Sequence, residues 1–184
     1  GARELAGELL ALYAQRQRAE GIAFDSDGDL VEALEASFAY EETVDQRRAI
    51  EAVKDDLESG RPMDRLVCGD VGFGKTEVAV RAAFVAVANG KQALLLSPTT
   101  VLAQQHWNTC RERYRDLPVN VEMVSRFRKP AEVKRVLRDF AAGKVDVLIG
   151  THRVLSRDVI PRDLGVVIVD EEQRFGVAQK ELLR

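Results

Sequence analysis

The chain has 184 residues, of which 46% are hydrophobic and 31% are charged, and its formal net charge is -3. This length allows one well-packed core with a short appendage, and the composition is typical of a globular rather than a disordered protein. No apolar stretch approaches the roughly 18 residues of a membrane-spanning helix. The acidic balance also does not indicate nucleic-acid binding in the way that a strongly basic domain would.

The N-terminal part of the chain is expected to be helical. Residues 2–19 carry leucines at helical spacing with charged residues between them, which predicts an amphipathic helix. Residues 25–29 imitate a calcium loop, but the glycine is misplaced and Ala36 stands where a Glu ligand belongs. We interpret them as a loop that caps a helix over Leu30–Ala39 through Asp27 or Asp29. Because the chain starts inside a helical pattern and without Met, we expect it to be a piece of a longer protein.

From Thr43 onward, helices and strands alternate. Thr43 is expected to cap a helix that carries Ile50 and Val53 and ends at Gly60. Apolar runs without alternation predict strands that are buried on both faces, at 65–68, 93–96, 119–124, 147–149 and 166–169. Helices are predicted near 75–88, 100–115 and 131–141. The pattern predicts a doubly wound, mainly parallel α/β sheet with an N-terminal helical extension.

Two cysteines, Cys68 and Cys110, fall in a predicted strand and a predicted helix. Their spacing matches no metal motif, so we expect two buried thiols in a reducing compartment, which indicates the cytoplasm. A basic cluster near Cys110 is interpreted as a solvated helix face rather than a nucleic-acid patch. It consists of Arg111, Arg113, Arg115, Arg126, Arg128 and Lys129.

Residues Gly69-Asp70-Val71-Gly72-Phe73-Gly74-Lys75-Thr76 form a phosphate-binding loop of the pattern G-x4-G-K-[ST]. Glycines allow backbone N–H groups to wrap around phosphates, while Lys75 reaches the β- and γ-phosphates and the Thr76 hydroxyl binds magnesium. A predicted strand precedes the loop and a predicted helix follows it, as this chemistry requires. A dinucleotide fingerprint is excluded, because Glu77 stands where its third glycine belongs. We therefore expect ATP and Mg²⁺ as cofactors.

A second motif follows the last predicted strand, which delivers Asp170 and Glu171 at its carboxyl end. Open α/β sheets bind ligands at that end of their strands. One carboxylate can hold magnesium, and the next can orient or deprotonate the attacking water. A solvated strand end is the alternative for this pair by itself, but the phosphate loop upstream favours the functional interpretation.

Four segments together resemble motifs I, Ia, Ib and II of superfamily 2 helicases and translocases: Gly69–Thr76, Ser97–Thr100, Gly150–His152 and Asp170–Gln173. The extension to Gly176 is similar to the group that contains the RecG helicases and the bacterial transcription-repair coupling factors. Phe73, Ser125-Arg126-Phe127 and Phe175–Val177 resemble the coupling factors, since the RecG branch is expected to have a small residue in place of Phe73. The resemblance implies a first RecA-like motor domain over 25–184, ending before motif III, preceded by a linking helix over 1–24.

The resemblance also implies an adenine-reading Q motif, made of Gln46, Thr43 and an aromatic at Phe38 or Tyr40. An amide can pair with the adenine edge while an aromatic ring stacks on it. Val44 stands where the family often has proline. The alternative for Gln46 is an ordinary glutamine on the helix surface.

Further positions match the family's DNA-facing residues, whose short hydroxyls and basic side chains suit phosphate contacts without sequence readout. His152 could instead be a structural histidine, and Thr100 replaces an arginine that is common in motif Ia. In motif II, Gln173 is implied to couple the ATP site to DNA. The matching DNA-facing residues are Thr99, Gln105, Ser125, Arg126, Thr151, His152 and Arg153.

The function that the resemblance implies is an ATP-driven double-stranded DNA translocase that displaces stalled RNA polymerase and recruits excision-repair proteins through other domains. A second RecA-like domain in cis would supply an arginine finger, which is worth about 10³–10⁵ in rate. We therefore expect these 184 residues alone to hydrolyse ATP at close to background. Two alternatives stay open: a RecG-type motor acting on branched DNA, and a nucleotide-dependent binding switch.

Overall fold

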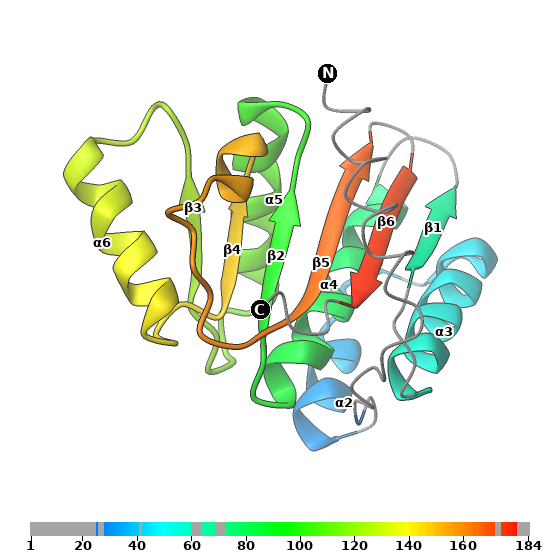
Figure 1. The fold of residues 1–184 in the computed structure, drawn as a ribbon. Helices are drawn as coiled ribbons and strands as arrows, with labels where there is room; N and C mark the ends of the chain where they lie inside the picture. Colours follow the sequence, from blue (N-terminus) through cyan, green and yellow to red (C-terminus); the bar gives the residue numbers. More distant parts are fainter. Residues whose placement is uncertain are drawn as a thin grey trace.

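The computed structural model describes residues 25, 28–40, 42–59, 64–68, 73–171 and 174–179, with the backbone alone at 64–68, 73–75, 171 and 174–179. The helices are α2 (Asp29–Ala36), α3 (Val44–Glu58), α4 (Phe73–Ala88), α5 (Thr100–Arg113), α6 (Pro130–Ala141) and the short 3-10 helix η1 (His152–Leu155). The strands are β1 (Asp64–Cys68), β2 (Gln92–Leu96), β3 (Val121–Val124), β4 (Val147–Gly150), β5 (Leu164–Glu171) and β6 (Arg174–Gln179) (Figure 1). The predicted helix over 2–19, Asp27 and Gly60 lie outside the described residues.

The six strands form one sheet in the order β1-β6-β5-β2-β4-β3. Strands β5 and β2, β2 and β4, and β4 and β3 pair in parallel, as the apolar runs predicted. Strand β6 pairs antiparallel with both β5 and β1, and the sequence analysis did not predict it. The five predicted strands are therefore present, and the sheet is mainly parallel.

Helices cover both faces of the sheet, which confirms the doubly wound α/β fold. Successive residues of β2 explain why, since Ala93 and Leu95 pack toward α4 and α5 whereas Leu94 and Leu96 pack toward α6. In Figure 1, α4 and α5 lie behind the sheet and α6 lies beside β3. Each face therefore has its own apolar core.

The helix ends follow local chemistry. Thr43 caps α3 through a reciprocal capping box with Gln46, as predicted for the cap. Helices α4 and α6 are followed by Gly90 and Gly143, both with positive φ, which a glycine adopts at low cost. The predicted carboxylate cap of α2 is wrong for Asp29, because Gly28 is the N-cap residue and Asp29 lies in the first turn. Within the described residues, none of the helices is long and apolar enough to cross a membrane.

Candidate functional site

The predicted functional residues follow the carboxyl ends of neighbouring parallel strands. Asp170 lies at the end of β5, and Thr99, Thr151 and Ser125 follow β2, β4 and β3. Because these four strands are adjacent and parallel, their carboxyl ends meet at one edge of the sheet. The residues assigned to ATP chemistry thus lie toward β5, and those assigned to DNA lie toward β3.

The end of the predicted phosphate loop coincides with the start of α4. This helix begins at Phe73, two residues earlier than predicted, so Gly74, Lys75 and Thr76 belong to its first turn. The first backbone N–H groups of a helix have no partner within the helix and favour an anion. Residues Gly69–Gly72 lie outside the described residues, as do the side chains of Phe73 and Lys75.

Thr76 is half-buried and lines a small cavity enclosed by α4, α5 and strands β2, β4 and β5. His106 of α5 and Ile168 of β5 line the same cavity, next to otherwise apolar side chains. Helix α4, which follows the phosphate loop, and strand β5, which carries Asp170, therefore line the same cavity.

Asp170 is held by a residue that the sequence analysis did not single out. Its Oδ2 atom lies 2.8 Å from Nε2 of His106, and the two side chains are 8% and 7% exposed. A carboxylate only accepts hydrogen bonds, so His106 donates from Nε2. Among the described residues, no hydrogen bond reaches Oδ1 of Asp170. His106 therefore orients the Asp170 carboxylate through Oδ2, and Oδ1 can bind a ligand.

The donor set fits magnesium. Mg²⁺ prefers oxygen ligands and is usually held by one or two carboxylates together with water and phosphate oxygens. Thr76 offers a hydroxyl and Asp170 a carboxylate oxygen from two elements that pack together. The Glu171 backbone ends β5, whereas its side chain and all of Gln173 lie outside the described residues.

Gln46 is not an ordinary surface residue. Only 8% of it is exposed, and its Oε1 accepts a hydrogen bond of 2.7 Å from the backbone N–H of Thr43. The Thr43 hydroxyl in turn accepts from the Gln46 backbone N–H. Since an amide oxygen has two lone pairs, Gln46 keeps one acceptor site and its NH₂ group for a ligand.

The two candidate adenine-stacking aromatics differ in their surroundings. Phe38 lies beneath the guanidinium groups of Arg81 and Arg113, at 5.3 and 5.4 Å from its ring centroid. Tyr40 meets Phe38 edge to face and is 75% exposed. The ring of Phe38 is thus engaged by two cations, whereas that of Tyr40 is open.

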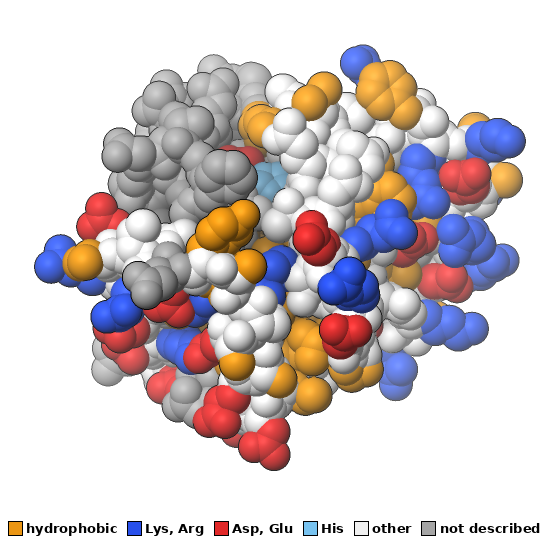
Figure 2. All heavy atoms as spheres, turned by 180° about the vertical axis from the view of Figure 1, so that it is seen from behind, with side chains coloured by type: hydrophobic (Ala, Val, Ile, Leu, Met, Phe, Trp, Pro, Cys, Tyr) orange, Lys and Arg blue, Asp and Glu red, His pale blue; other side chains and the backbone are white. Residues whose placement is uncertain are grey.

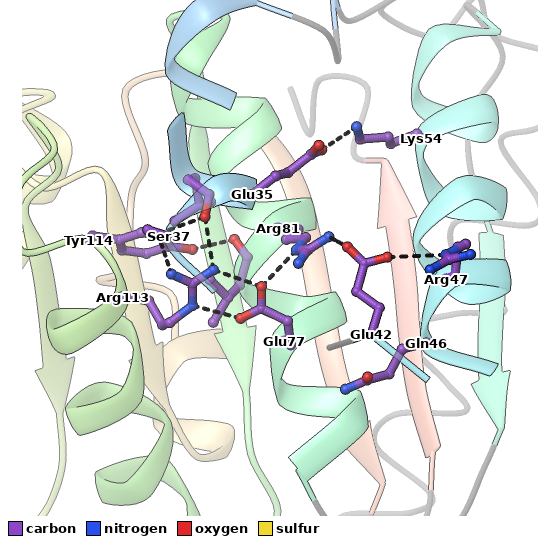
Figure 3. A network of polar contacts seen from close by, with 12 residues as sticks. Glu35, Ser37, Glu42, Gln46, Arg47, Lys54, Glu77, Arg81, Arg113 and Tyr114 are labelled. Atoms are coloured by element: carbon purple, nitrogen blue, oxygen red, sulfur yellow. Dashed lines mark hydrogen bonds and ion pairs between the residues drawn. The ribbon is translucent and has the colours of Figure 1, made fainter. Parts of the chain in front are cut away.

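Both arginines belong to a charged network that starts next to Thr76 (Figure 3). Glu77 is 4% exposed, and its carboxylate accepts hydrogen bonds of 2.6 to 2.8 Å from Arg81 and Arg113. Arg81 also pairs with Glu42 at 2.5 Å. Arg113 reaches back to the carbonyl of Leu34 and the hydroxyl of Ser37. The network joins α4, α5, the end of α2 and the segment before α3.

The network shifts the pKa values of its members. The hydrogen bond from Arg81 lowers the pKa of Glu42 against the opposing effect of burial. Burial acts to lower the pKa of Arg81, but hydrogen bonds from its guanidinium to Glu42 and Glu77 outweigh it and the pKa is raised. Both groups are therefore held in their charged forms.

The basic cluster predicted as a solvated helix face is partly used inside the structure. Arg113 belongs to the network with Glu77, Arg128 pairs with Glu132 and donates to the Met123 carbonyl, and Arg111 lies over Trp107. Figure 2 shows Lys and Arg side chains gathered on the side of the molecule that carries β3 and α6, with acidic side chains between them. The cluster is thus divided between structural arginines and a basic surface.

Most of the predicted DNA-facing residues fall into two groups, those with exposed side chains that form no hydrogen bond with other described residues and those engaged within the protein. Gln105, Arg126 and His152 are exposed, with Arg126 stacked over the exposed ring of Phe127. The exposure of His152 does not favour a buried structural role. Thr99 is exposed but caps α5, and buried Ser125 accepts a hydrogen bond from the Phe127 N–H.

Thr151 is half-buried and is the N-cap residue of η1. Arg153 forms two hydrogen bonds of 2.7 Å with Asp158, and these raise the pKa of Arg153 and lower that of Asp158. The charge of Arg153 is therefore already balanced within the protein.

Cys110 is buried in α5, as predicted, and desolvation raises the pKa of its thiol to about 12. The side chain of Cys68 lies outside the described residues.

Residues 43–184 match the DEAD/DEAH box helicase family model. This region includes the phosphate loop, the α4 and α5 helices and the whole sheet. The chain belongs to the DEAD/DEAH box helicase family.

Within that family the chain is similar to transcription-repair-coupling factors. It is 52% identical to the one from Bacillus subtilis and 54% identical to the one from Haemophilus influenzae, over 99% of its own length. The chain spans 16% of the length of these relatives.

Solved structures agree with this helicase-family fold. A RecG bound to a three-way DNA junction has a TM-score of 0.79 and 32% identity, covering 94% of this chain and 25% of that one. A hypothetical ATP-dependent RNA helicase from Sulfolobus tokodaii, with a TM-score of 0.55 and 20% identity, shares the fold alone. The chain is therefore a helicase-type motor domain similar to that of RecG.

Sequence reasoning missed two features of the candidate site: His106 and the network around Glu77. His106 lies on α5 far from Asp170 in sequence, and only the order β5-β2 with α5 against it brings them together. The signals available were a polar residue on the apolar face of a predicted helix and the acidic residue after Thr76.

Proposed function

We propose that the chain is the ATP-binding motor domain of a double-stranded DNA translocase that couples transcription to nucleotide excision repair. The observation that carries the proposal is the edge of the sheet where Asp170 lies beside the ends of β2, β4 and β3, with Thr76 of α4 lining a cavity against β2 and β5. The similarity to transcription-repair-coupling factors over 99% of the chain supports the choice within the helicase family.

In this proposal the loop Gly69–Thr76 holds the ATP phosphates, with Lys75 on the β- and γ-phosphates. Gln46 reads the adenine edge, supported by Thr43. Thr76 and Asp170 would hold magnesium, which neutralises charge on the phosphates when bound. Glu171 orients the attacking water, and Gln173 relays the state of the ATP site across the cleft to DNA.

DNA lies on the other half of the same edge. Exposed Arg126, His152 and Gln105 and the hydroxyls of Thr99 and Thr151 supply donors for phosphate oxygens. Such contacts follow the backbone without reading bases, as a translocase requires. Ser125 and Arg153 contribute less, because Ser125 is buried and Arg153 is paired with Asp158.

The partners follow from the proposed role. A second RecA-like domain in cis completes the ATP site, and RNA polymerase and excision-repair proteins bind other parts of the full-length protein. We place this activity in the cytoplasm.

The test uses the full-length protein and its Glu171→Gln variant. A motor hydrolyses ATP faster with double-stranded DNA and displaces stalled RNA polymerase, and the variant binds ATP but loses both activities. A nucleotide-dependent binding switch would instead keep its partner contact and its function in the variant. That outcome would contradict the proposal.

The DNA substrate that stimulates hydrolysis distinguishes a coupling-factor motor from the RecG-type alternative. A coupling-factor motor is stimulated by linear double-stranded DNA, whereas a branched-DNA helicase requires forks or junctions. Hydrolysis rates of the full-length protein on linear and three-way DNA of equal length decide between them.

The isolated 184 residues are expected to bind nucleotide weakly and to hydrolyse it at close to background, since the arginine finger belongs to the partner domain. Robust DNA-stimulated hydrolysis by this chain alone would contradict that expectation.

A further inference from the structure

The hydrogen bond between His106 and Asp170 joins two elements that approach the site from different sides. Asp170 is the next-to-last residue of β5, and His106 lies in the second turn of α5, with 6% of the residue exposed. Their 2.8 Å contact is buried, so water does not replace it. Among the described residues His106 is the one donor to this buried carboxylate, and it sets the orientation of the group.

We propose that His106 is a positioning residue for ATP hydrolysis, which fixes the orientation of the Asp170 carboxylate that would hold magnesium. The proposal rests on the function proposed above. His106 uses one carboxylate oxygen and leaves the other for magnesium or its water shell. Partners that orient a ligating carboxylate typically contribute about 10–100-fold in metal affinity or activity.

The cavity beside His106 supports this role. Thr76, the other proposed magnesium ligand, lines the same cavity as His106. The imidazole therefore lines a cavity together with residues of α4, which begins at the phosphate loop, and of β5, which carries Asp170. A side chain that merely filled space here would need no donor aimed at Oδ2, and the remaining lining of the cavity is apolar.

The experiment compares substitutions of His106 in the full-length protein. His106→Leu keeps bulk and removes the donor. In His106→Gln the longer side chain carries an amide donor that can reach Oδ2, whereas in His106→Asn the shorter side chain cannot. Cys110→Ala is the matched control, because Cys110 lines the same cavity on the same helix and does not contact Asp170.

Two measurements are made with saturating double-stranded DNA. The first is ATP hydrolysis over a range of magnesium concentrations. The second is equilibrium binding of fluorescent methylanthraniloyl-ADP, with magnesium and with EDTA. The second readout does not depend on turnover.

For His106→Leu we expect kcat to fall about 10–100-fold and the magnesium concentration for half-maximal rate to rise. The affinity of His106→Leu for the ADP analogue in EDTA should stay within about twofold of wild type, because the phosphate loop is unchanged. The increase in this affinity that magnesium causes in the wild type should be lost in the variant. His106→Gln should recover most of the rate, and Cys110→Ala should behave as wild type.

Unchanged kcat and magnesium dependence in His106→Leu would overturn the proposal. An equal loss of kcat in His106→Gln, His106→Leu and Cys110→Ala would also overturn it. Such a result would indicate that His106 contributes only by packing. If circular dichroism shows that His106→Leu is unfolded, the comparison of His106→Asn with His106→Gln decides, and equal rates overturn the inference. Failure of the wild-type protein to hydrolyse ATP with magnesium would contradict the proposed function instead.

Discussion

Phe38 and Tyr40 show how two neighbouring aromatics can take different roles. The guanidinium groups of Arg81 and Arg113 lie over the ring of Phe38, which fixes it in the charged network. Tyr40 is 75% exposed and touches Phe38 by its edge. A ring that stacks on adenine needs a free face, which favours Tyr40.

We therefore predict that Tyr40→Ala weakens ATP binding, by about 1–3 kcal/mol if stacking on adenine resembles stacking on other bases. Phe38→Ala should instead lower the free energy of unfolding, because two cation–π contacts and buried area are lost. Nucleotide titration and urea unfolding of both variants separate the effects. Equal ATP affinity of Tyr40→Ala and wild type would contradict the assignment.

At the scale of elements, Glu77 connects the start of α4 with the end of α5. Its carboxylate, 4% exposed, is satisfied by two arginines, and Arg113 continues to the end of α2. A buried charge that loses a partner keeps its desolvation cost, so this contact matters more than a surface ion pair.

Arg113→Leu is expected to lower the free energy of unfolding by about 3 kcal/mol, since Glu77 would keep only Arg81. Arg111→Leu, on the same helix but exposed over Trp107, should cost less than about 1 kcal/mol. Denaturant titration of the two variants provides the comparison, and equal costs would contradict the role of the network.

Packing explains why a glycine stands at position 150 of the third motif segment, Gly150–His152. Gly150 ends β4, and a Cβ there would lie 2.6 Å from Cγ1 of Val154 and 2.8 Å from the carbonyl oxygen of Val124. The turn into η1 and the neighbouring strand therefore leave no room for a side chain.

Gly150→Ala should destabilise the fold by about 1–3 kcal/mol through overpacking. Gly28→Ala is the comparison variant: a Cβ there would meet nothing within 4 Å, so it should show only the cost of replacing the glycine N-cap of α2. Thermal unfolding measures both, and a tolerated alanine at Gly150 would show that β3 and η1 can separate.

At the scale of the whole molecule, Glu42 is expected to contribute to the pH dependence of the free energy of unfolding. Its folded pKa is lowered below the ordinary 4.5 by Arg81, so its contribution to stability is present above pH 4.5. That contribution is lost as the pH falls through the lower folded pKa, because protonation removes the charge that Arg81 binds.

Glu42→Gln is therefore expected to reduce the free energy of unfolding at pH 7 and to weaken its decline below about pH 4.5. Urea unfolding of variant and wild type from pH 7 to pH 3 measures the difference. If the two curves stay parallel throughout, the contact with Arg81 does not contribute to stability.

The sequence by itself determined the α/β alternation, the cap of α3 and the position of Asp170 at a strand end, because each depends on residues near one another in the chain. Apolar runs predict parallel strands from burial alone, and glycines mark helix ends through their backbone freedom.

Only the tertiary structure decided which side chains meet. The strand order, with β5 beside β2, places α5 close enough for His106 to bind Asp170, and no local pattern encodes that distance. The same holds for Arg113 and Glu77, and for β6, whose antiparallel pairing depends on both its neighbours. Contacts between elements follow from packing over the whole fold, which is why sequence reasoning could name candidate residues but not the contacts that His106 and Arg113 make.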